Sequence, residues 1–248
     1  MEKVKILGVK IDAIQMVDVV SQIRVTALAH QRTLMTHVNI HGLNLAYENP
    51  WFSRFLNRAD IVFCDGMGVL FGARLLGYHL PERFTLADWV WPLVEMGAIN
   101  SLRFYLLGNP PGMAERAAQV IQKRFPDFII AGSQHGYFNK TPGHTENEAV
   151  IEQINAAAPD VLMVGFGMPV QEQWLQDNWH RLDATVTMTC GAIFEYIAGD
   201  LPRGPAWMTQ NYLEWLARVV ISPRRYARRY ARDIPLFIYR VLKQRIGL

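Results

Sequence analysis

The segment VLMVGFGMPVQEQW, residues 161–174, contains the pattern that decides the fold. Its first residues, 161–164, are all apolar, which is typical of a strand buried on both faces, as strands are in a parallel sheet. A glycine-rich turn follows, and Pro169 suits the first turn of a helix over residues 170–178. The segment therefore predicts a strand, a tight turn and a covering helix.

The same alternation runs along the rest of the chain. Short apolar, β-branched runs predict strands at residues 4–9, 33–38, 60–64, 103–107, 128–131, 161–164 and 184–188. Helical patterns lie between most of them, including residues 13–28, capped by Asp12, and residues 112–124, with Pro111 in the first turn. Residues 134–144 are rich in Gly, Pro and Asn and predict a loop that is either mobile or covers a ligand. Strand–helix alternation predicts an α/β fold with a mostly parallel sheet and helices on both faces.

The composition is that of a globular protein. The chain has 248 residues, of which 50% are hydrophobic and 19% charged, and this excludes disorder, collagen and coiled coil. We find no apolar run of about 18 residues and no signal-peptide pattern, so we expect neither a membrane span nor secretion. Cys64 and Cys190 lack disulfide-framework and metal-ligand spacing, so we expect buried thiols in a reducing compartment.

Positive charge is concentrated at the C-terminus. The net charge is +3, yet residues 218–248 hold nine lysines and arginines against one acid, which leaves the preceding part net negative. This contrast predicts a catalytic body over residues 1–217 and a basic helical appendage over residues 218–248. The arginines that would form a cationic helical face are Arg224, Arg225, Arg228, Arg229 and Arg232. With the apolar residues that follow, they predict binding to an anionic membrane surface; a solvated helix or a contact in a homo-oligomer stays open, and we expect no nucleic acid.

Candidate functional residues follow the predicted strands, because ligands of parallel sheets bind at the carboxyl ends of the strands. Asp65 is the sharpest candidate for a general base, although an aspartate that only bonds its own Asp-Gly turn is the alternative. His37, His41 and His135 also stay open as bases. Glycine-rich turns leave backbone N–H groups free for a diphosphate, but no complete G-x-G-x-x-G is present, which argues against a dinucleotide enzyme.

Several common chemistries lack their motifs. The sequence has no H-E-x-x-H, Walker A or G-x-S-x-G pattern, so zinc hydrolysis, ATP hydrolysis and serine acylation are unsupported. It has no D-x-D either, so arginine and helix N-termini would have to balance a diphosphate without a metal. Arg83 is a candidate for that role, with an ion pair to Glu82 or Asp88 as the alternative. We expect no metal and no cofactor.

An ordered series of motifs resembles one enzyme family. The motifs are T-x-x-N at 36–39, ADIVFCDGMG at 59–68, ER at 82–83, LLGNPPG at 106–112, HGYF at 135–138, VGFGMPVQEQW at 164–174, CGAIFEYIAG at 190–199, RGPAW at 203–207 and an arginine-rich stretch at 213–230. Together they resemble the WecG/TagA/CpsF glycosyltransferases. The resemblance implies a Rossmann-like core and an inverting, metal-independent transfer of a hexose. The donor would be a UDP-sugar and the acceptor a polyprenyl-diphosphate-linked sugar on the cytoplasmic face of the plasma membrane.

The resemblance also implies residue roles. Asp65 would be the general base, with Thr36 and Asn39 near the reacting hydroxyl or the donor sugar. The donor or its diphosphate would meet Arg83, Gly108, Asn109, Gly165, Gly167, Gln171 and Glu172. The arginines of the appendage would bring the site to its lipid-borne acceptor. A membrane-recruited adaptor that binds a nucleotide without catalysis is the alternative function.

Three residues depart from the pattern of the family. Leu86 stands in place of a common glycine, Val170 in place of a lysine and Glu195 in place of an aspartate. We expect these residues to surround the donor pocket. The donor sugar therefore stays open between N-acetylmannosamine, glucose and another hexose.

Overall fold

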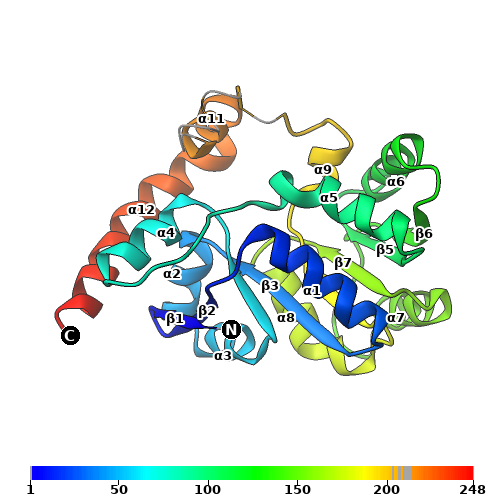
Figure 1. The fold of residues 1–248 in the computed structure, drawn as a ribbon, viewed down its shortest axis with the longest axis horizontal. Coiled ribbons are helices and arrows are strands. Elements are labelled where there is room, and N and C mark those ends of the chain that lie inside the picture. Colours follow the sequence, from blue (N-terminus) through cyan, green and yellow to red (C-terminus); the bar gives the residue numbers. More distant parts are fainter. Residues whose placement is uncertain (1, 203, 206–207, 209–213, 248) are drawn as a thin grey trace.

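The core of the structure is a six-stranded parallel sheet (Figure 1). The computed structural model describes residues 2–202, 204–205, 208 and 214–247. The strands are β3 (Thr33–Val38), β4 (Ile61–Cys64), β5 (Arg103–Gly108), β6 (Ile129–Gln134), β7 (Val161–Gly165) and β8 (Val186–Thr189). Their order is β4-β3-β8-β7-β5-β6, and every neighbouring pair is parallel. Six of the seven expected strands are therefore confirmed, with ends shifted by up to three residues.

Helices cover both faces of this sheet, as expected. Alternate strand residues enter two separate cores: Val161 and Met163 pack in one, Leu162 and Val164 in the other. The first core is closed by α1 (Met16–Leu28), α5 (Leu86–Ile99), α6 (Met113–Arg124) and α9 (Ile193–Ile197). The second is closed by α2 (Ile40–Glu48), α3 (Pro50–Arg58), α7 (Thr145–Ala157) and α8 (Val170–Asn178), with η1 (Trp179–Arg181) after α8.

The expected strand at residues 4–9 is wrong. The segment folds instead into an antiparallel hairpin of β1 (Lys3–Ile6) and β2 (Val9–Asp12), apart from the main sheet. Leu7 and Gly8 have φ values of +47° and +84°, which are typical of a two-residue hairpin turn. The run is short and also contains Lys5, so Gly8 alone did not give a clear sign of the turn.

Asp12 also differs from its expected role as a helix cap. Its carboxylate is buried at the end of the hairpin, where it accepts a hydrogen bond of 2.8 Å from the Val62 backbone N–H. The same oxygen lies 3.2 Å from the Lys3 ammonium. The carboxylate therefore ties the hairpin to β4, and helix α1 begins later, at Met16.

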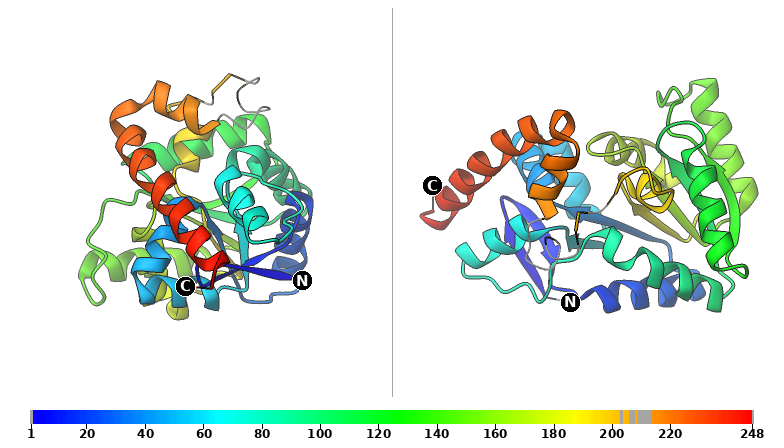
Figure 2. Two further views of the ribbon diagram at one scale, coloured as in Figure 1. Left: turned by 90° about the vertical axis from the view of Figure 1, so that its left-hand side faces the viewer. Right: turned by 90° about the horizontal axis from the view of Figure 1, so that it is seen from above.

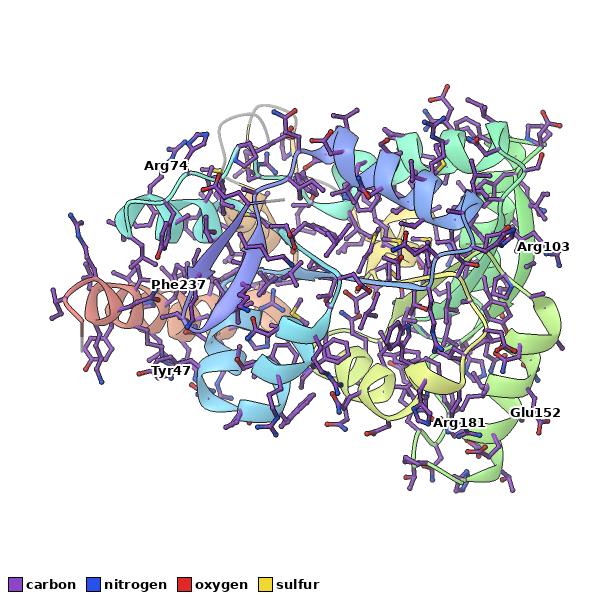
Figure 3. All side chains as sticks on the ribbon, turned by 60° about the horizontal axis from the view of Figure 1, so that its bottom comes forward. Tyr47, Arg74, Arg103, Glu152, Arg181 and Phe237 are labelled. Carbon is purple, nitrogen blue, oxygen red and sulfur yellow. The ribbon has the colours of Figure 1, made fainter. Side chains whose placement is uncertain are left out.

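The basic C-terminal segment forms two helices, α11 (Glu214–Ile221) and α12 (Pro223–Arg245), as expected for a helical appendage. Figures 1 and 2 show α12 along one end of the molecule, beside α2 and α4 (Met67–Leu75). Figure 3 shows Phe237 and Tyr47 at this end and Arg103, Glu152 and Arg181 at the other. The predicted boundary between residues 217 and 218 lies inside α11, and the division into two domains stays a prediction.

Apolar packing and a polar network together hold α12 in place. Phe237 and Val241 are buried in the same core as α2 and α4. The Asp233 carboxylate lies 2.8 Å from Nδ1 of His41. The Arg240 guanidinium donates to Asn44 and, at 2.6 Å, to the Glu48 carboxylate. It also lies 4.5 Å from the centre of the Tyr47 ring.

We expect Phe237→Ala to lower the free energy of unfolding by about 3 kcal/mol, because a buried phenyl ring is replaced by a cavity. Tyr239→Ala is the matched control on the same helix: Tyr239 is 64% exposed and Phe237 only 2%. The control should change stability by less than about 0.5 kcal/mol. Urea denaturation of both variants measures the difference, and equal effects would contradict the described packing of α12.

Candidate active site

The carboxyl ends of the strands meet at one edge of the sheet, beside a central cavity of about 340 Å³. Its wall includes Asn39 after β3, Asp65 after β4, Gly167 after β7 and Gly191 after β8. Arg229 of α12 also lines it. The topology therefore brings together candidate residues that are more than 100 positions apart in sequence.

Asp65 lies where β4 ends and lines the central cavity with its half-buried side chain. Its backbone N–H donates to the Val38 carbonyl at 2.9 Å, which extends the pairing of β4 with β3 by one residue. The Asn39 side-chain amide donates to the Asp65 carboxylate at 3.3 Å. Asp65 is thus held by its neighbours in an orientation that faces a cavity, as a general base requires.

Asn39 has its own amide orientation fixed by helix α2. It is the N-cap of that helix, and its Oδ1 accepts from the Gly42 N–H at 3.0 Å. Since Oδ1 is engaged in this cap, the amide NH₂ is the end that points to Asp65. A helix cap therefore positions the donor that holds the candidate base.

Thr36 is placed differently from the expectation that it lies near the reacting groups. Its side chain is fully buried, and its hydroxyl lies 2.9 Å from the Thr189 hydroxyl. Thr189 in turn lies 3.2 Å from Nδ1 of His37, which lines the central cavity. Thr36 is therefore behind the wall of the cavity and is linked to it through Thr189 and His37.

Gln171 joins two of the turns that follow the strands. Its buried Oε1 accepts from the Gly167 N–H and from the Gly191 N–H, each at 3.2 Å. Its Nε2 donates to Glu172 Oε1 at 2.8 Å. Gln171 lines the central cavity. This buried amide shapes the part of the wall that follows β7 and β8, whereas Asp65 follows β4 near the edge of the sheet.

Glu172 is fully buried beside Gln171. Burial raises the pKa of its carboxyl from 4.5 to about 7, because a charged carboxylate loses its hydration there. In the part of the chain that the structure describes, its Oε2 has no hydrogen-bond partner. A protonated carboxylic acid fits this environment better than a carboxylate does.

The glycines expected to contact a nucleotide also allow the strand ends to approach one another. A Cβ at Gly108 would lie 2.3 Å from the Gly165 carbonyl oxygen, and one at Gly165 would lie 2.5 Å from the Gly191 carbonyl oxygen. Asn109 fastens this contact, because its Nδ2 donates to both carbonyls, at 2.6 Å and 3.0 Å. No side chain larger than hydrogen fits at Gly108 or Gly165 without moving the backbone.

A second, wider cavity of about 830 Å³ adjoins these turns. Residues 136–140 of the predicted loop form part of its wall, and a role in covering a ligand stays a prediction. Lys140 lies in this wall, with its ammonium 4.4 Å and 4.5 Å from the ring centres of Phe138 and Phe166. Partial burial lowers the pKa of Lys140. The wide and central cavities share Gly167 and Gly191, so they adjoin each other at these two turns.

A third cavity, of about 340 Å³, lies on the side of Asp65 that faces α12, and we call it the apolar groove. Arg83 lines it together with Asp65 and Arg229. The Arg83 guanidinium also lies 3.3 Å from the Asp88 carboxylate, so one of the two ion pairs considered for it is present. That pair holds the guanidinium at the wall of the groove.

The arginines expected on one membrane-binding face separate into two groups. Arg224, Arg228 and Arg232 are exposed on α12, whereas Arg229 is turned inward, between the Tyr226 and Tyr230 rings. It lines both the central cavity and the apolar groove, because α12 packs against the α/β body. The side chain of Arg225 lies outside the described residues. Sequence reasoning missed the inward position of Arg229, which depends on how α12 docks.

The other histidine candidates differ in position. His41 lines the central cavity and the apolar groove and is engaged with Asp233, whereas His135 accepts from the Tyr137 N–H at the surface. Burial raises the pKa of both cysteine thiols, which fits the expected buried, unreactive residues. Among the described residues, we find no group of three or more His, Cys, Asp and Glu that could hold a metal ion. In the same residues, no helix has the length and apolar character to span a bilayer.

Asp65 lines both the central cavity and the apolar groove at the carboxyl edge of a Rossmann-like sheet, which is where ligands of such sheets bind. This arrangement is typical of an enzyme, and the sequence comparisons give its class. A model of the glycosyl transferase WecG/TagA/CpsF family matches residues 4–248. The chain belongs to this family, and the expected glycosyltransferase class is confirmed.

Similar curated proteins carry a more detailed name. The N-acetylglucosaminyldiphosphoundecaprenol N-acetyl-beta-D-mannosaminyltransferase of Staphylococcus aureus strain NCTC 8325 / PS 47 is 30% identical over 244 residues. The match covers 97% of this chain and 92% of that protein. The protein of the same name from strain MW2 is 29% identical with the same coverage.

The three departures from the family pattern all lie at the cavities. Leu86 lines the central cavity, and Val170 and Glu195 line the wide cavity. The Glu195 N–H donates to Asn109 Oδ1 at 3.2 Å, which places this residue beside the contact of the strand ends. The expectation that these three residues surround a pocket is thus consistent with their positions in the cavity walls.

We expect Glu172→Gln to weaken the dependence of stability on pH. Because its pKa is raised, the Glu172 carboxyl contributes its full share to stability below about pH 4.5 and loses that share as the pH rises to about 7. In this range the folded state retains a proton that the unfolded state releases. The melting temperature of the wild type should therefore fall between pH 5 and pH 7.5 by several degrees more than that of Glu172→Gln. Glu152→Gln, at an exposed site on α7, is the control. If the melting temperatures of Glu172→Gln and the wild type change equally with pH, the result would contradict this account.

Proposed function

We propose that the protein moves a hexose from a UDP-sugar to a polyprenyl-diphosphate-linked sugar, with inversion and without a metal ion. The single observation that supports this most is the position of Asp65 at the boundary of the central cavity and the apolar groove. A base at this boundary can meet a donor on one side and an acceptor on the other. Membership of the family supports the same reaction class.

The donor is proposed to extend from the wide cavity into the central cavity. Glu146, Glu195 and Asp200 line the wide cavity, and their carboxylates can accept from ribose hydroxyls and the uracil N–H. The diphosphate is proposed to lie near Arg229 in the central cavity, because a guanidinium binds phosphate oxygens strongly. The hexose then lies beside Asp65.

The reaction is proposed as a single displacement. Asp65 takes the proton from the acceptor hydroxyl while that oxygen forms a bond to the anomeric carbon. The bond from the anomeric carbon to UDP breaks on the opposite face, and UDP leaves with the electron pair. Attack from the face opposite the leaving group inverts the configuration, and arginine balances the charge that develops on the diphosphate.

The substrate classes rest on the relatives and on the departures within the site. The similar staphylococcal proteins are named for an undecaprenol-diphosphate-linked acceptor and an N-acetylmannosaminyl donor group. We propose the same acceptor class here. Because Leu86, Val170 and Glu195 change the walls of the cavities, the donor is proposed to be either an N-acetylmannosamine type or a glucose-type hexose.

The enzyme is proposed to act as a peripheral protein on the cytoplasmic face of the plasma membrane. Arg224 and Arg228 are exposed on α12, and Val220 and Tyr239 expose 71% and 64% of their surface nearby in sequence. Cationic and apolar groups on one helical segment favour binding to anionic lipid. Burial of these apolar groups in a homo-oligomer is the alternative.

We expect Asp65→Asn to lower kcat by about 10² to 10⁴-fold, because the amide cannot accept the hydroxyl proton. Binding of the UDP-sugar should change little. UDP release with UDP-hexoses and a lipid-diphosphate-sugar measures the effect, and Asp18→Asn, at an exposed site on α1, is the control. Near-normal turnover by Asp65→Asn would refute the role of the base. If the wild type binds UDP but releases none under turnover conditions, the adaptor alternative holds.

We expect the double variant Arg224→Glu, Arg228→Glu to bind anionic vesicles at least about tenfold more weakly at low salt, since each cation near such a surface contributes about 1 kcal/mol. The matched control is Arg24→Glu, Lys123→Glu, which reverses two exposed charges on α1 and α6. Vesicle sedimentation measures the binding. Equal retention of both variants on the vesicles would contradict a role of the exposed arginines of α12 in membrane binding.

A further inference from the structure

The apolar groove has two chemically different ends. Its inner end is polar and is formed by Asp65, Arg83 and Arg229. Its outer part lies between α4 on one side and α11 and α12 on the other, and the residues there are Met67, Phe71, Trp215, Tyr230, Ile234 and Ile238. A ligand that fills this groove must therefore carry an anionic, polar head and an extended apolar tail.

The apolar walls follow from the helical spacing on both sides. Met67 and Phe71 are four residues apart on α4, and Tyr230, Ile234 and Ile238 repeat at the same interval on α12. Residues at this interval share one face of a helix, so each helix presents an apolar stripe to the groove. Phe71 remains 49% exposed although it is a large apolar residue in this wall.

Two glycines of α4 set how closely the helices pack around the groove. A Cβ at Gly72 would lie 2.5 Å from the Phe237 ring of α12, and a Cβ at Gly68 would lie 2.4 Å from Ile40 of α2. Larger residues at these positions would push α4 away from its neighbours. The groove therefore has a close-packed floor, and its opening lies between the exposed parts of α4 and α12.

We propose that the outer part of the apolar groove holds the first isoprene units of the lipid-linked acceptor. This inference rests on the proposed function and adds the site of the lipid chain to it. The Arg83 guanidinium at the inner end matches the acceptor diphosphate in charge, and the chain next to it needs an apolar wall. Asp65 belongs to the same groove, so the sugar on the other side of the diphosphate is directed toward the base.

The same arrangement gives the appendage a role in recognition. One wall of the groove comes from the α/β body and the other from α12. The isoprene units would contact both, so the acceptor chain would bridge the two segments. A bilayer that binds the exposed arginines of α12 would then lie close to the opening through which the chain enters.

Farnesyl diphosphate is a soluble probe that carries both chemical features, and inorganic diphosphate carries only the charge. We expect the wild type to bind farnesyl diphosphate at least tenfold more tightly than diphosphate in calorimetric titrations. Phe71→Ser should remove most of this preference while the affinity for diphosphate stays unchanged. The matched control is Tyr78→Ser, because Tyr78 is 40% exposed and does not line the groove.

The measurement separates this inference from the proposed function, because it does not depend on turnover. Equal affinities of the wild type for the two probes would overturn the proposed lipid site, even if UDP release shows that the enzyme is active. An unchanged preference in Phe71→Ser would overturn it as well. Equal affinities together with a dimer that Phe71→Ser converts to a monomer would assign the groove to contact between protomers.

Discussion

The close approach of three backbone segments at the carboxyl edge of the sheet is the constraint on which the site depends. Gly108, Gly165 and Gly191 pack so tightly that a Cβ at either of the first two would overlap a neighbouring carbonyl. Asn109 and Gln171 then hold these segments with buried amide groups. Gly191 lines both the central and the wide cavity, and Gly165 lines the wide one, so this contact shapes the walls between which the donor is proposed to lie.

Helix α12 packs against the α/β body and forms part of the walls of the central cavity and the apolar groove. The contacts of Asp233, Phe237 and Arg240 with the body keep α12 in place, and Arg229 is thereby turned inward. The same helix keeps other arginines exposed. In the proposed function, α12 supplies positive charge to the reaction through Arg229 and to a lipid surface through its exposed arginines. This arrangement would link catalysis to membrane binding.

Regular patterns in the sequence predicted most of the fold, and three-dimensional packing determined the rest. Continuous apolar runs such as residues 161–164 identified the buried parallel strands, because both faces of such a strand must be covered. The hairpin at Leu7 and Gly8 was missed, since a short apolar run gives no clear sign of a turn. Asp65 was predicted because it directly follows a predicted strand, and it lines the central cavity. The inward position of Arg229 depends on contacts between distant segments, which sequence periodicity does not reveal.

The central claim is that the Asp65 carboxylate takes the proton of the acceptor hydroxyl. The most direct test is a crystal structure of the enzyme with an unreactive UDP-sugar analogue and a short-chain lipid-diphosphate-sugar. The account predicts that the attacking hydroxyl lies about 2.6 to 3.2 Å from an Asp65 oxygen, on the side of the anomeric carbon opposite UDP. A hydroxyl bound beyond the reach of Asp65, with another base in contact with it, would contradict the account.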